Sequence, residues 1–187
     1  MVCVTDHHTL GGAHAALEHD LGVRVVVGEE IRTPAGEVIG LFLDDRIPYV
    51  LPLDEVVARI KAQQGIVYAP HACDQDRAAL GEEHLARLAA AGTLDVVETF
   101  NAKVADDTYN KKAAKVARRL GIAEAAGSDA HDAAGIGAAY VEMPDFDGPR
   151  DFLTGLAAGR IVGELRPHAP RYGASRARGD PAVPPVA

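Results

Sequence analysis

Short apolar stretches alternate along most of the chain with longer segments that have helical periodicity. Apolar runs of four or five residues occupy 1–5, 23–27, 66–69, 94–97 and 122–126. Between such runs, apolar positions recur three or four residues apart, as at Val56, Val57 and Ile60 in a helix expected from Leu53 to about Gln64. Short runs with few polar positions are typical of strands buried on both faces. The alternation therefore predicts an α/β protein with a parallel sheet or barrel.

One hairpin is expected to interrupt this alternation. Thr33-Pro34-Ala35-Gly36 has the residue types of a tight turn, and residues 37–43 have the pattern of its returning strand. Further helices are expected at 9–21 (buried through Leu10, Ala13, Leu17 and Leu21), 80–91, 111–120 and 149–158, and further strands at 138–143 and 161–165. After residue 173 the aperiodic mixture of Arg, Gly, Pro, Val and Ala predicts disorder. We therefore expect one domain over residues 1–173 and a disordered tail over residues 174–187.

Composition narrows the class of protein. The 187 residues are 48% hydrophobic and 25% charged, which is ordinary for a globular domain. No apolar run reaches the ~18–20 residues of a membrane span, and no secretion signal is apparent, so a cytoplasmic protein without a membrane partner is expected. A formal charge of -8 disfavours nucleic acid as a partner, because binding to a phosphate backbone depends on clustered Lys and Arg.

Acidic and imidazole side chains follow most of the apolar runs. They are Asp6 and His7, Glu30, His71, Glu98, and the pair Asp129 and His131. In a barrel the carboxyl ends of the strands meet at one rim, so these side chains would line one cleft. Asp129 and His131 are two positions apart, so their oxygen and nitrogen atoms can converge on one cation. An isolated Asp-x-His is more often a solvated turn, but five such strand ends predict a shared metal site.

Five motifs, taken in order, resemble those of the PHP (polymerase and histidinol phosphatase) domain family. They are Thr5-Asp6-His7, Gly28-Glu29-Glu30, Val67-Tyr68-Ala69-Pro70-His71, Val97-Glu98-Thr99-Phe100-Asn101-Ala102 and Gly127-Ser128-Asp129-Ala130-His131. The resemblance covers residue 1 to about residue 165 and implies a distorted, TIM-like (β/α)7 barrel with up to three divalent cations.

The chain departs from the family at its first motif. A PHP domain normally opens with a strand that carries a His-x-His pair, but only four residues precede Thr5 here. We therefore expect a barrel that is incomplete at its N-terminal strand, and a start upstream of Met1 is one hypothesis for the difference. The exposed edge of the strand at residues 1–5 would be free to pair with a second copy of the chain.

The resemblance also implies roles for individual residues. The implied metal ligands are His7, Glu30, His71, Asp129 and His131, with Glu98 as a further ligand or a neighbour of the cluster. The implied catalytic residues are Asp6, which would support His7, and Lys103, which would neutralise the phosphate. The candidates for substrate binding are Asn101, Lys103, Arg166 and His168.

The function implied by the resemblance is metal-dependent hydrolysis of a small phosphorylated metabolite or nucleotide. Histidine and carboxylate ligands suit Mn, Zn or Fe, so we expect one to three divalent ions of one of these elements. Three alternatives stay open: a catalytically impaired PHP-like module for binding or scaffolding, a proofreading exonuclease associated with a polymerase, and a related metal-dependent hydrolase such as an amidohydrolase.

Overall fold

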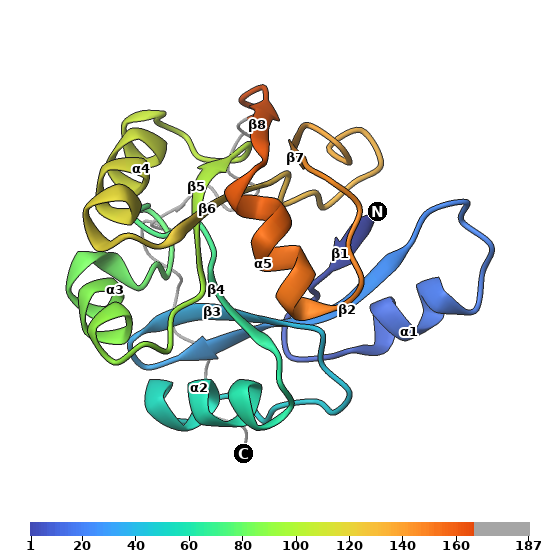
Figure 1. Ribbon diagram of the computed structural model, residues 1–187, viewed down its shortest axis with the longest axis horizontal. Helices are drawn as coiled ribbons and strands as arrows, with labels where there is room; N and C mark the ends of the chain where they lie inside the picture. The colour runs from blue at the N-terminus through green and yellow to red at the C-terminus, as the bar shows by residue number, and fades with distance from the viewer. Residues whose placement is uncertain (167–187) are drawn as a thin grey trace, which may run out of the picture.

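The structure is a computed structural model that describes residues 1–166, in which six strands form one curled sheet (Figure 1). The elements are β1 (Val2–Val4), α1 (Gly11–Leu17), β2 (Val25–Thr33), β3 (Gly36–Leu41), α2 (Leu53–Ala62), β4 (Ile66–Ala69), α3 (Gly81–Ala90), β5 (Val96–Asn101), α4 (Thr108–Leu120), β6 (Ala123–Gly127), β7 (Ala139–Glu142), α5 (Pro149–Ala157) and β8 (Arg160–Gly163). The predicted α/β class is confirmed. The tail predicted at 174–187 lies outside the described residues.

The sheet is mixed and open. Its strands follow the order β1-β2-β3-β4-β5-β6, and β7 and β8 form a separate antiparallel pair. β1 pairs with β2, β4 with β5 and β5 with β6 in parallel, whereas β3 is antiparallel to both of its neighbours. The predicted hairpin is thus confirmed as β2 and β3. Because it adds an antiparallel strand and β7 and β8 leave the main sheet, a full (β/α)7 barrel is not confirmed within residues 1–166.

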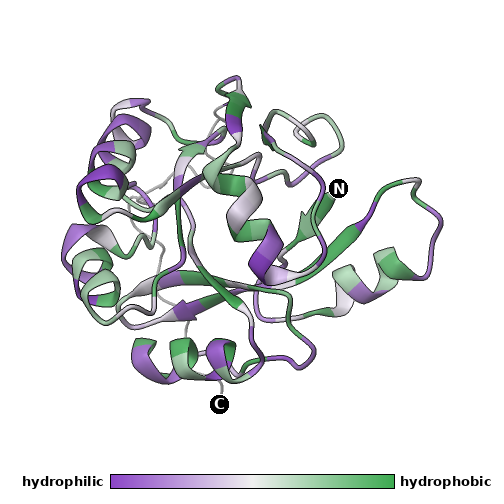
Figure 2. Cartoon of the chain, viewed as in Figure 1, coloured by the Kyte–Doolittle hydropathy of each residue, from purple (hydrophilic) through white to green (hydrophobic). Residues whose placement is uncertain are grey.

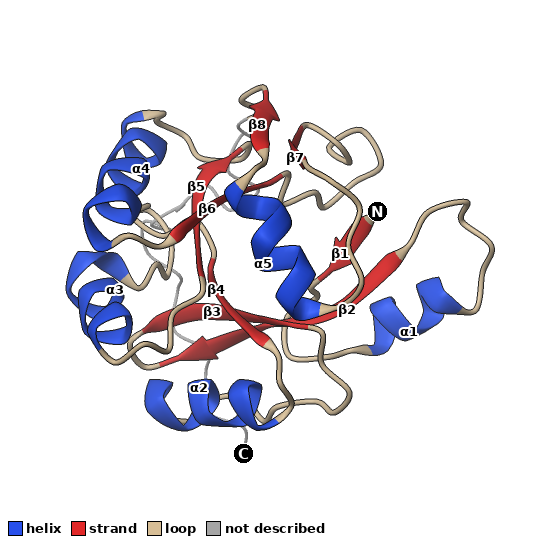
Figure 3. Ribbon diagram, in the orientation of Figure 1, coloured by secondary structure: helices blue, strands red, loops and turns tan. Residues whose placement is uncertain are grey.

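Apolar side chains cover both faces of the sheet. One core joins the sheet to α2, α3 and α4 and includes Val38, Val56, Leu85 and Val116. A second core lies beneath α5, which crosses the other face (Figure 3). This core contains a cluster of Phe42, Phe146 and Phe152 whose rings meet edge to face, alongside the buried residues of the sheet. The strands between the cores are largely apolar, while the helices are amphipathic (Figure 2), as the periodicity predicts.

Two elements differ in length from the sequence prediction. α1 ends at Leu17, and the leucines expected to continue its buried face are exposed, Leu17 by 55% and Leu21 by 49%. α1 packs mainly against the sheet edge at β1 and β2, and the side chains of Leu17 and Leu21 beyond that edge stay exposed. β2 instead runs on to Thr33, because pairing with β3 supplies its backbone partners throughout the hairpin. Glu30 therefore lies inside a strand and not beyond its end.

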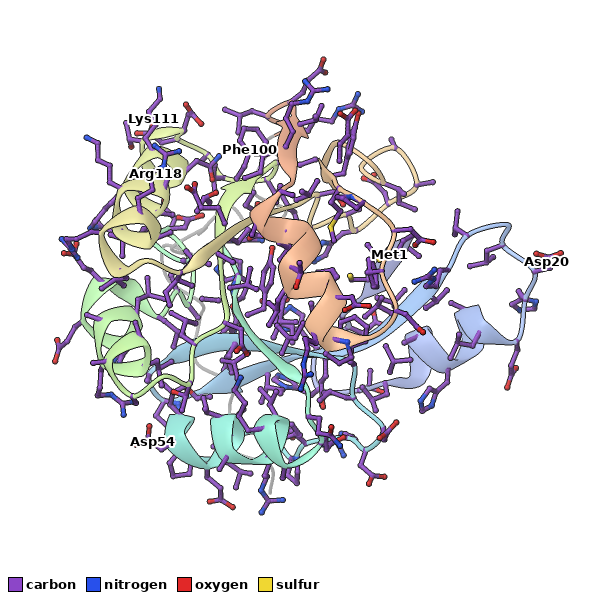
Figure 4. The ribbon with its side chains drawn as sticks, in the orientation of Figure 1. Met1, Asp20, Asp54, Phe100, Lys111 and Arg118 are labelled. Atoms are coloured by element: carbon purple, nitrogen blue, oxygen red, sulfur yellow. The ribbon has the colours of Figure 1, made fainter. Side chains whose placement is uncertain are left out.

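The basic helix α4 presents its charges to solvent. Lys111, Lys112, Lys115, Arg118 and Arg119 are all exposed, and the labelled Lys111 projects away from the sheet in Figure 4. Lys111 also pairs with Asp107 one turn earlier at 2.8 Å. Across residues 1–166, no helix is both long and apolar enough to cross a membrane.

Candidate metal centre

The β2–β3 hairpin places two carboxylates on one face of the sheet. Side chains alternate between faces along a strand, so Glu30 and Arg32 share the face of Val26. By the same period Glu37 shares the face of Ile39, and both Val26 and Ile39 belong to the core beneath α5. The register sets Arg32 directly opposite Glu37, and the Arg32 Nη2 donates to Glu37 Oε1 at 2.8 Å. The hairpin thereby orients Glu37 beside Glu30.

Two histidines reach these carboxylates from neighbouring strands. His7 follows β1, forms a parallel bridge with Glu30, and places its Nε2 3.8 Å from Glu30 Oε2 and its Nδ1 4.0 Å from Glu37 Oε1. His71 follows β4, and its Nε2 lies 3.0 Å from Glu30 Oε1 and 3.6 Å from Glu37 Oε2. We call His7, Glu30, Glu37 and His71 the hairpin cluster.

The hairpin cluster has the geometry and charge of a cation site. One ligand atom each from His7, Glu30 and Glu37 can be chosen so that all lie within 4.8 Å of one another. Burial opposes protonation of the His71 ring, but its hydrogen bond with Glu30 and the charge of Glu98 outweigh burial, so the pKa of His71 is raised. Two imidazoles and two carboxylates form a donor set suited to Zn, Mn or Fe. These residues therefore fit a divalent metal ion.

Asp129 is differently surrounded, because cationic and amide groups already contact its carboxylate. Arg77 Nη1 donates to Asp129 Oδ2, Asn101 Nδ2 donates to the same oxygen at 3.3 Å, and Lys103 Nζ lies 3.8 Å from Oδ1. Burial opposes ionisation, but Arg77 and Lys103 outweigh it and hold the pKa of Asp129 below its usual value. We call Asp129, Arg77, Asn101 and Lys103 the Asp129 cluster.

One pocket of about 350 Å³ joins the two clusters. Its lining consists of His7, Glu30, Arg32, Glu37, His71, Asp76, Arg77, Ala78 and Asp129. Arg77 lies in the loop between β4 and α3, and carboxylates of both clusters affect its pKa. Burial disfavours its charge, but Asp129 and then Glu30 outweigh that effect, so the pKa of Arg77 is raised.

Glu98 is buried beneath the pocket and links the two clusters. Its Oε1 accepts a hydrogen bond from the Tyr68 hydroxyl at 2.9 Å. Its Oε2 accepts from the backbone N–H of His71 at 2.5 Å and from Asn101 Nδ2 at 2.8 Å. Burial raises the pKa of Glu98. Because protein donors occupy both oxygens, this arrangement supports a role in positioning His71, whose φ of 32° falls in the sparsely populated left-handed region.

A glycine makes room for Glu98. A Cβ added to Gly127 would lie 2.2 Å from Glu98 Oε1, so the Glu98 side chain would have to leave its hydrogen-bonded position. The glycine that opens the Gly127 to His131 motif therefore has a steric function here, at the point where β6 passes the buried carboxylate.

The structure brings together His7, Glu30, His71 and Asp129 of the predicted site residues, and it sets Glu98, Asn101 and Lys103 next to them. His131 lies at the margin of the Asp129 cluster, with its side chain 50% exposed and its Nδ1 2.8 Å from Lys103 Nζ. Their roles as ligands or substrate-binding groups stay predictions.

Asp6 and Arg166, both predicted as site residues, belong to neither cluster. Asp6 is exposed, and its Oδ2 lies against Gly12 at the start of α1, where an added Cβ would be only 1.9 Å away. The exposed Arg166 donates to the carbonyl oxygen of Ala134 at 2.9 Å. His168 lies outside the described residues. The pocket lining includes neither Asp6 nor Arg166.

Sequence reasoning missed Glu37, Arg32 and Arg77. The first two had a usable signal, because a two-residue turn at Pro34 and Ala35 pairs Arg32 with Glu37, and period 2 then puts both on the face of Glu30. Arg77 lies in an irregular loop, where no periodic pattern indicates its direction.

Comparison with other proteins extends the motif resemblance. A family model described as PHP-associated matches residues 107–161. Two uncharacterised proteins of Methanocaldococcus jannaschii are similar in sequence. MJ1587 is 42% identical over 112 residues, which cover 59% of this chain and 63% of that protein. MJ0417 is 36% identical over 141 residues, which cover 68% of this chain and 58% of that protein. The matches thus span less than two thirds of either relative.

Three solved structures share the fold. A Bacteroides vulgatus two-domain protein, described as containing a predicted PHP-like metal-dependent phosphoesterase, has a TM-score of 0.62 and 16% identity, and the match covers 87% of this chain and 55% of that chain. PsfC from Pseudomonas syringae also has a TM-score of 0.62, with 20% identity and coverage of 86% and 75%. A Bifidobacterium adolescentis protein, described as a candidate metal-dependent phosphoesterase, has a TM-score of 0.57, 17% identity and coverage of 70% and 77%.

At these identities the solved structures establish the fold alone. The family model adds a sequence match over α4 to β8, and the five motifs appear in order along the folded chain. The motif order, the family match over residues 107–161 and the common fold together support the assignment of this chain to the PHP domain family.

Proposed function

We propose that this chain hydrolyses phosphate esters of small molecules with the help of a divalent metal ion held by the hairpin cluster. The observation that carries the proposal is the convergence of His7, Glu30, Glu37 and His71 in a pocket that also presents Arg32 and Arg77. Similar folds occur in two proteins that are described as metal-dependent phosphoesterases, which supports the same chemistry.

The chain's own groups would divide the work between the two clusters. His7, Glu30, Glu37 and His71 would hold the divalent ion, which would supply a water of lowered pKa and draw charge from the phosphoryl oxygens. Glu98 holds the backbone of His71 so that its ring faces Glu30, and Arg32 holds Glu37. Arg77 and Lys103 provide positive charge where the phosphoryl oxygens become more negative. Arg77 is suited to this task because a planar guanidinium matches a phosphate.

The pocket favours a small substrate. Its volume of about 350 Å³ lies at the small end of the range of roughly 300–1,000 Å³ that is usual for small-molecule sites. A phosphorylated metabolite or a mononucleotide fits this range, and Mn, Zn and Fe are the ions that suit the donor set.

The test is metal-dependent release of phosphate. The chain is stripped with a chelator, reloaded separately with Mn²⁺, Zn²⁺ or Fe²⁺, and assayed with p-nitrophenyl phosphate and nucleoside monophosphates. We expect activity to vanish with the metal and to return with at least one ion. His71→Gln should abolish it, and His84→Gln, on α3, should not.

Two outcomes would contradict the proposal. One is release of phosphate that persists after chelation or in His71→Gln. The other is tight metal binding without turnover of any ester, which would favour the alternative of a metal-binding module without catalysis.

A further inference from the structure

We propose that the pocket holds a single divalent cation, on the hairpin cluster, and that the Arg77 guanidinium, held by Asp129, takes the place of a second cation and binds a phosphate oxygen of the substrate. This inference rests on the proposed phosphoesterase function and specifies how the site divides metal binding from substrate binding.

The hairpin cluster has too little positive charge of its own. The side chains of Glu30 and Glu37 are 12% and 5% exposed, and both oxygens of Glu30 face imidazole rings. Among the described residues, the arginine that binds this pair is Arg32, and its side chain is 63% exposed. Both of its hydrogen bonds to the pair go to Oε1 of Glu37. Oε2 of Glu37 faces His71 instead. Two largely buried carboxylates in this arrangement favour a cation between them.

The Asp129 cluster has the opposite balance. A single carboxylate contacts the guanidinium of Arg77 and lies near the ammonium of Lys103, while Asn101 donates a further hydrogen bond. The Arg77 and Asp129 side chains are 25% and 14% exposed, so the pair is shielded from water. A metal ion at Asp129 would have to displace a largely buried arginine and leave its charge without this partner.

Arg77 is also positioned by the loop that begins at the metal-binding His71. The backbone N–H of Asp74 donates to the His71 carbonyl at 2.9 Å, and the N–H of Asp76 donates to the buried Asp74 side chain at 2.9 Å. The loop closes where Gly81 donates to the carbonyl of Ala72 at 3.1 Å. These hydrogen bonds hold the start and the end of the loop. The loop therefore keeps Arg77 in the lining of the pocket that also contains His71.

The guanidinium has donors to spare for a substrate. An arginine presents five N–H groups in a planar fork, and Arg77 uses Nη1 for Asp129. Arg77 and the hairpin cluster line the same pocket. A phosphate bound to an ion on the hairpin cluster would therefore meet the remaining Arg77 donors, in the charge-assisted geometry that guanidinium and phosphate groups form.

The first experiment counts and weighs metal ions. The stripped full chain is titrated with Mn²⁺ and with Zn²⁺ by calorimetry, and bound metal is measured by mass spectrometry after gel filtration. We expect one ion per chain in the native protein and in Asp129→Asn. Glu37→Gln should weaken binding by more than about 100-fold, beyond the roughly tenfold to 100-fold cost of losing an outer partner of a metal ligand. Glu124→Gln, a strand carboxylate paired with Arg118 outside the pocket, is the matched control.

The second experiment uses inorganic phosphate as the probe, titrated into the metal-loaded chain. Arg77→Gln should weaken phosphate binding by about 10- to 100-fold and leave the metal content at one ion, because a charged hydrogen-bond partner is lost from the substrate side. Arg118→Gln is the control for loss of an ion-paired arginine. Arg77→Lys, which keeps the charge without the fork, should show a smaller loss and serves if Arg77→Gln does not fold.

Three results would overturn the inference: two or more ions bound per native chain, loss of the ion in Asp129→Asn, or unchanged phosphate affinity in Arg77→Gln. Hydrolysis of phosphate esters by a chain with two bound ions would overturn the inference alone and leave the proposed function standing. A native chain that binds no ion would overturn both.

Discussion

The hairpin cluster and the Asp129 cluster both contain carboxylates that line the same pocket, yet they differ in what already balances their charge. Glu30 and Glu37 lie among two imidazole rings and one exposed arginine, whereas Asp129 contacts Arg77 and lies near Lys103. On our proposal, a carboxylate near a strand end binds a metal ion only where no protein cation already balances its charge. Its partners decide whether a cation is still required.

The largest expected effect comes from Glu30→Gln, which breaks the hairpin cluster at its centre. Glu30 faces both His7 and His71, so its loss should lower metal affinity and phosphoesterase kcat/KM by more than about 100-fold, beyond the cost of an outer partner. Calorimetry with Mn²⁺ and steady-state kinetics measure the two quantities. Glu142→Gln, which removes a strand carboxylate paired with Arg160, is the control. Equal metal affinity in Glu30→Gln and the native chain would erase the contrast between the clusters.

Gly127→Ala should disturb both clusters together, because Glu98 hydrogen-bonds to His71 and to Asn101. The added methyl group would collide with Glu98, and overpacking of this kind costs about 1–3 kcal/mol in the free energy of unfolding. Urea denaturation measures the loss. Gly11→Ala, at the exposed start of α1, should change stability by less than about 0.5 kcal/mol. A Gly127→Ala protein as stable as the native chain would show that Glu98 is free to move.

Arg32→Gln sharpens the comparison by removing the arginine that binds Glu37 of the hairpin cluster. Without its guanidinium, Glu37 loses the partner that fixes Oε1, and metal affinity should fall by roughly tenfold, as for other outer partners of metal ligands. The same calorimetric titration measures the change. An increase in affinity would mean that Arg32 competes with the metal for Glu37 and does not orient it.

The smallest effect is expected for Asp6→Asn. The resemblance implies a catalytic role for Asp6, but its carboxylate lies against Gly12 and outside the pocket lining. On this geometry kcat/KM should change by less than about threefold, as for most exposed positions away from special features. Steady-state assays with p-nitrophenyl phosphate decide between the two expectations, and a loss of 100-fold or more would restore Asp6 to the catalytic group.

Much of the fold could be predicted from periodicity. The helix α2 with its buried Val56, Val57 and Ile60 and the strand β4 were both predicted, because each carries a complete local pattern. The end of α1 was not predicted. The local sequence does not indicate whether Leu17 packs in a core or lies beyond the edge of the sheet. The strand order of the sheet was not predicted either, because it depends on pairings between residues far apart in the sequence.

The site residues that lie in strands or directly after them could be predicted from the sequence. His7, Glu30 and His71 follow or occupy strands, and the structure brings them together as the strand pattern predicts. The neutralisation of Asp129 by Arg77 was not predictable. It depends on the path of a loop, and ligand-type residues give no information about which cations lie beside them.

The chemistry of this pocket depends on the number of residues in the turn at Pro34 and Ala35. Thr33 pairs with Gly36 across this two-residue turn. The length of the turn therefore decides which face of the sheet each side chain of β3 occupies. One extra residue in that turn would point Glu37 toward the core that joins the sheet to α2 and bring Val38 to the face that carries the pocket. An insertion in this turn could therefore inactivate the site without substituting any residue that lines the pocket.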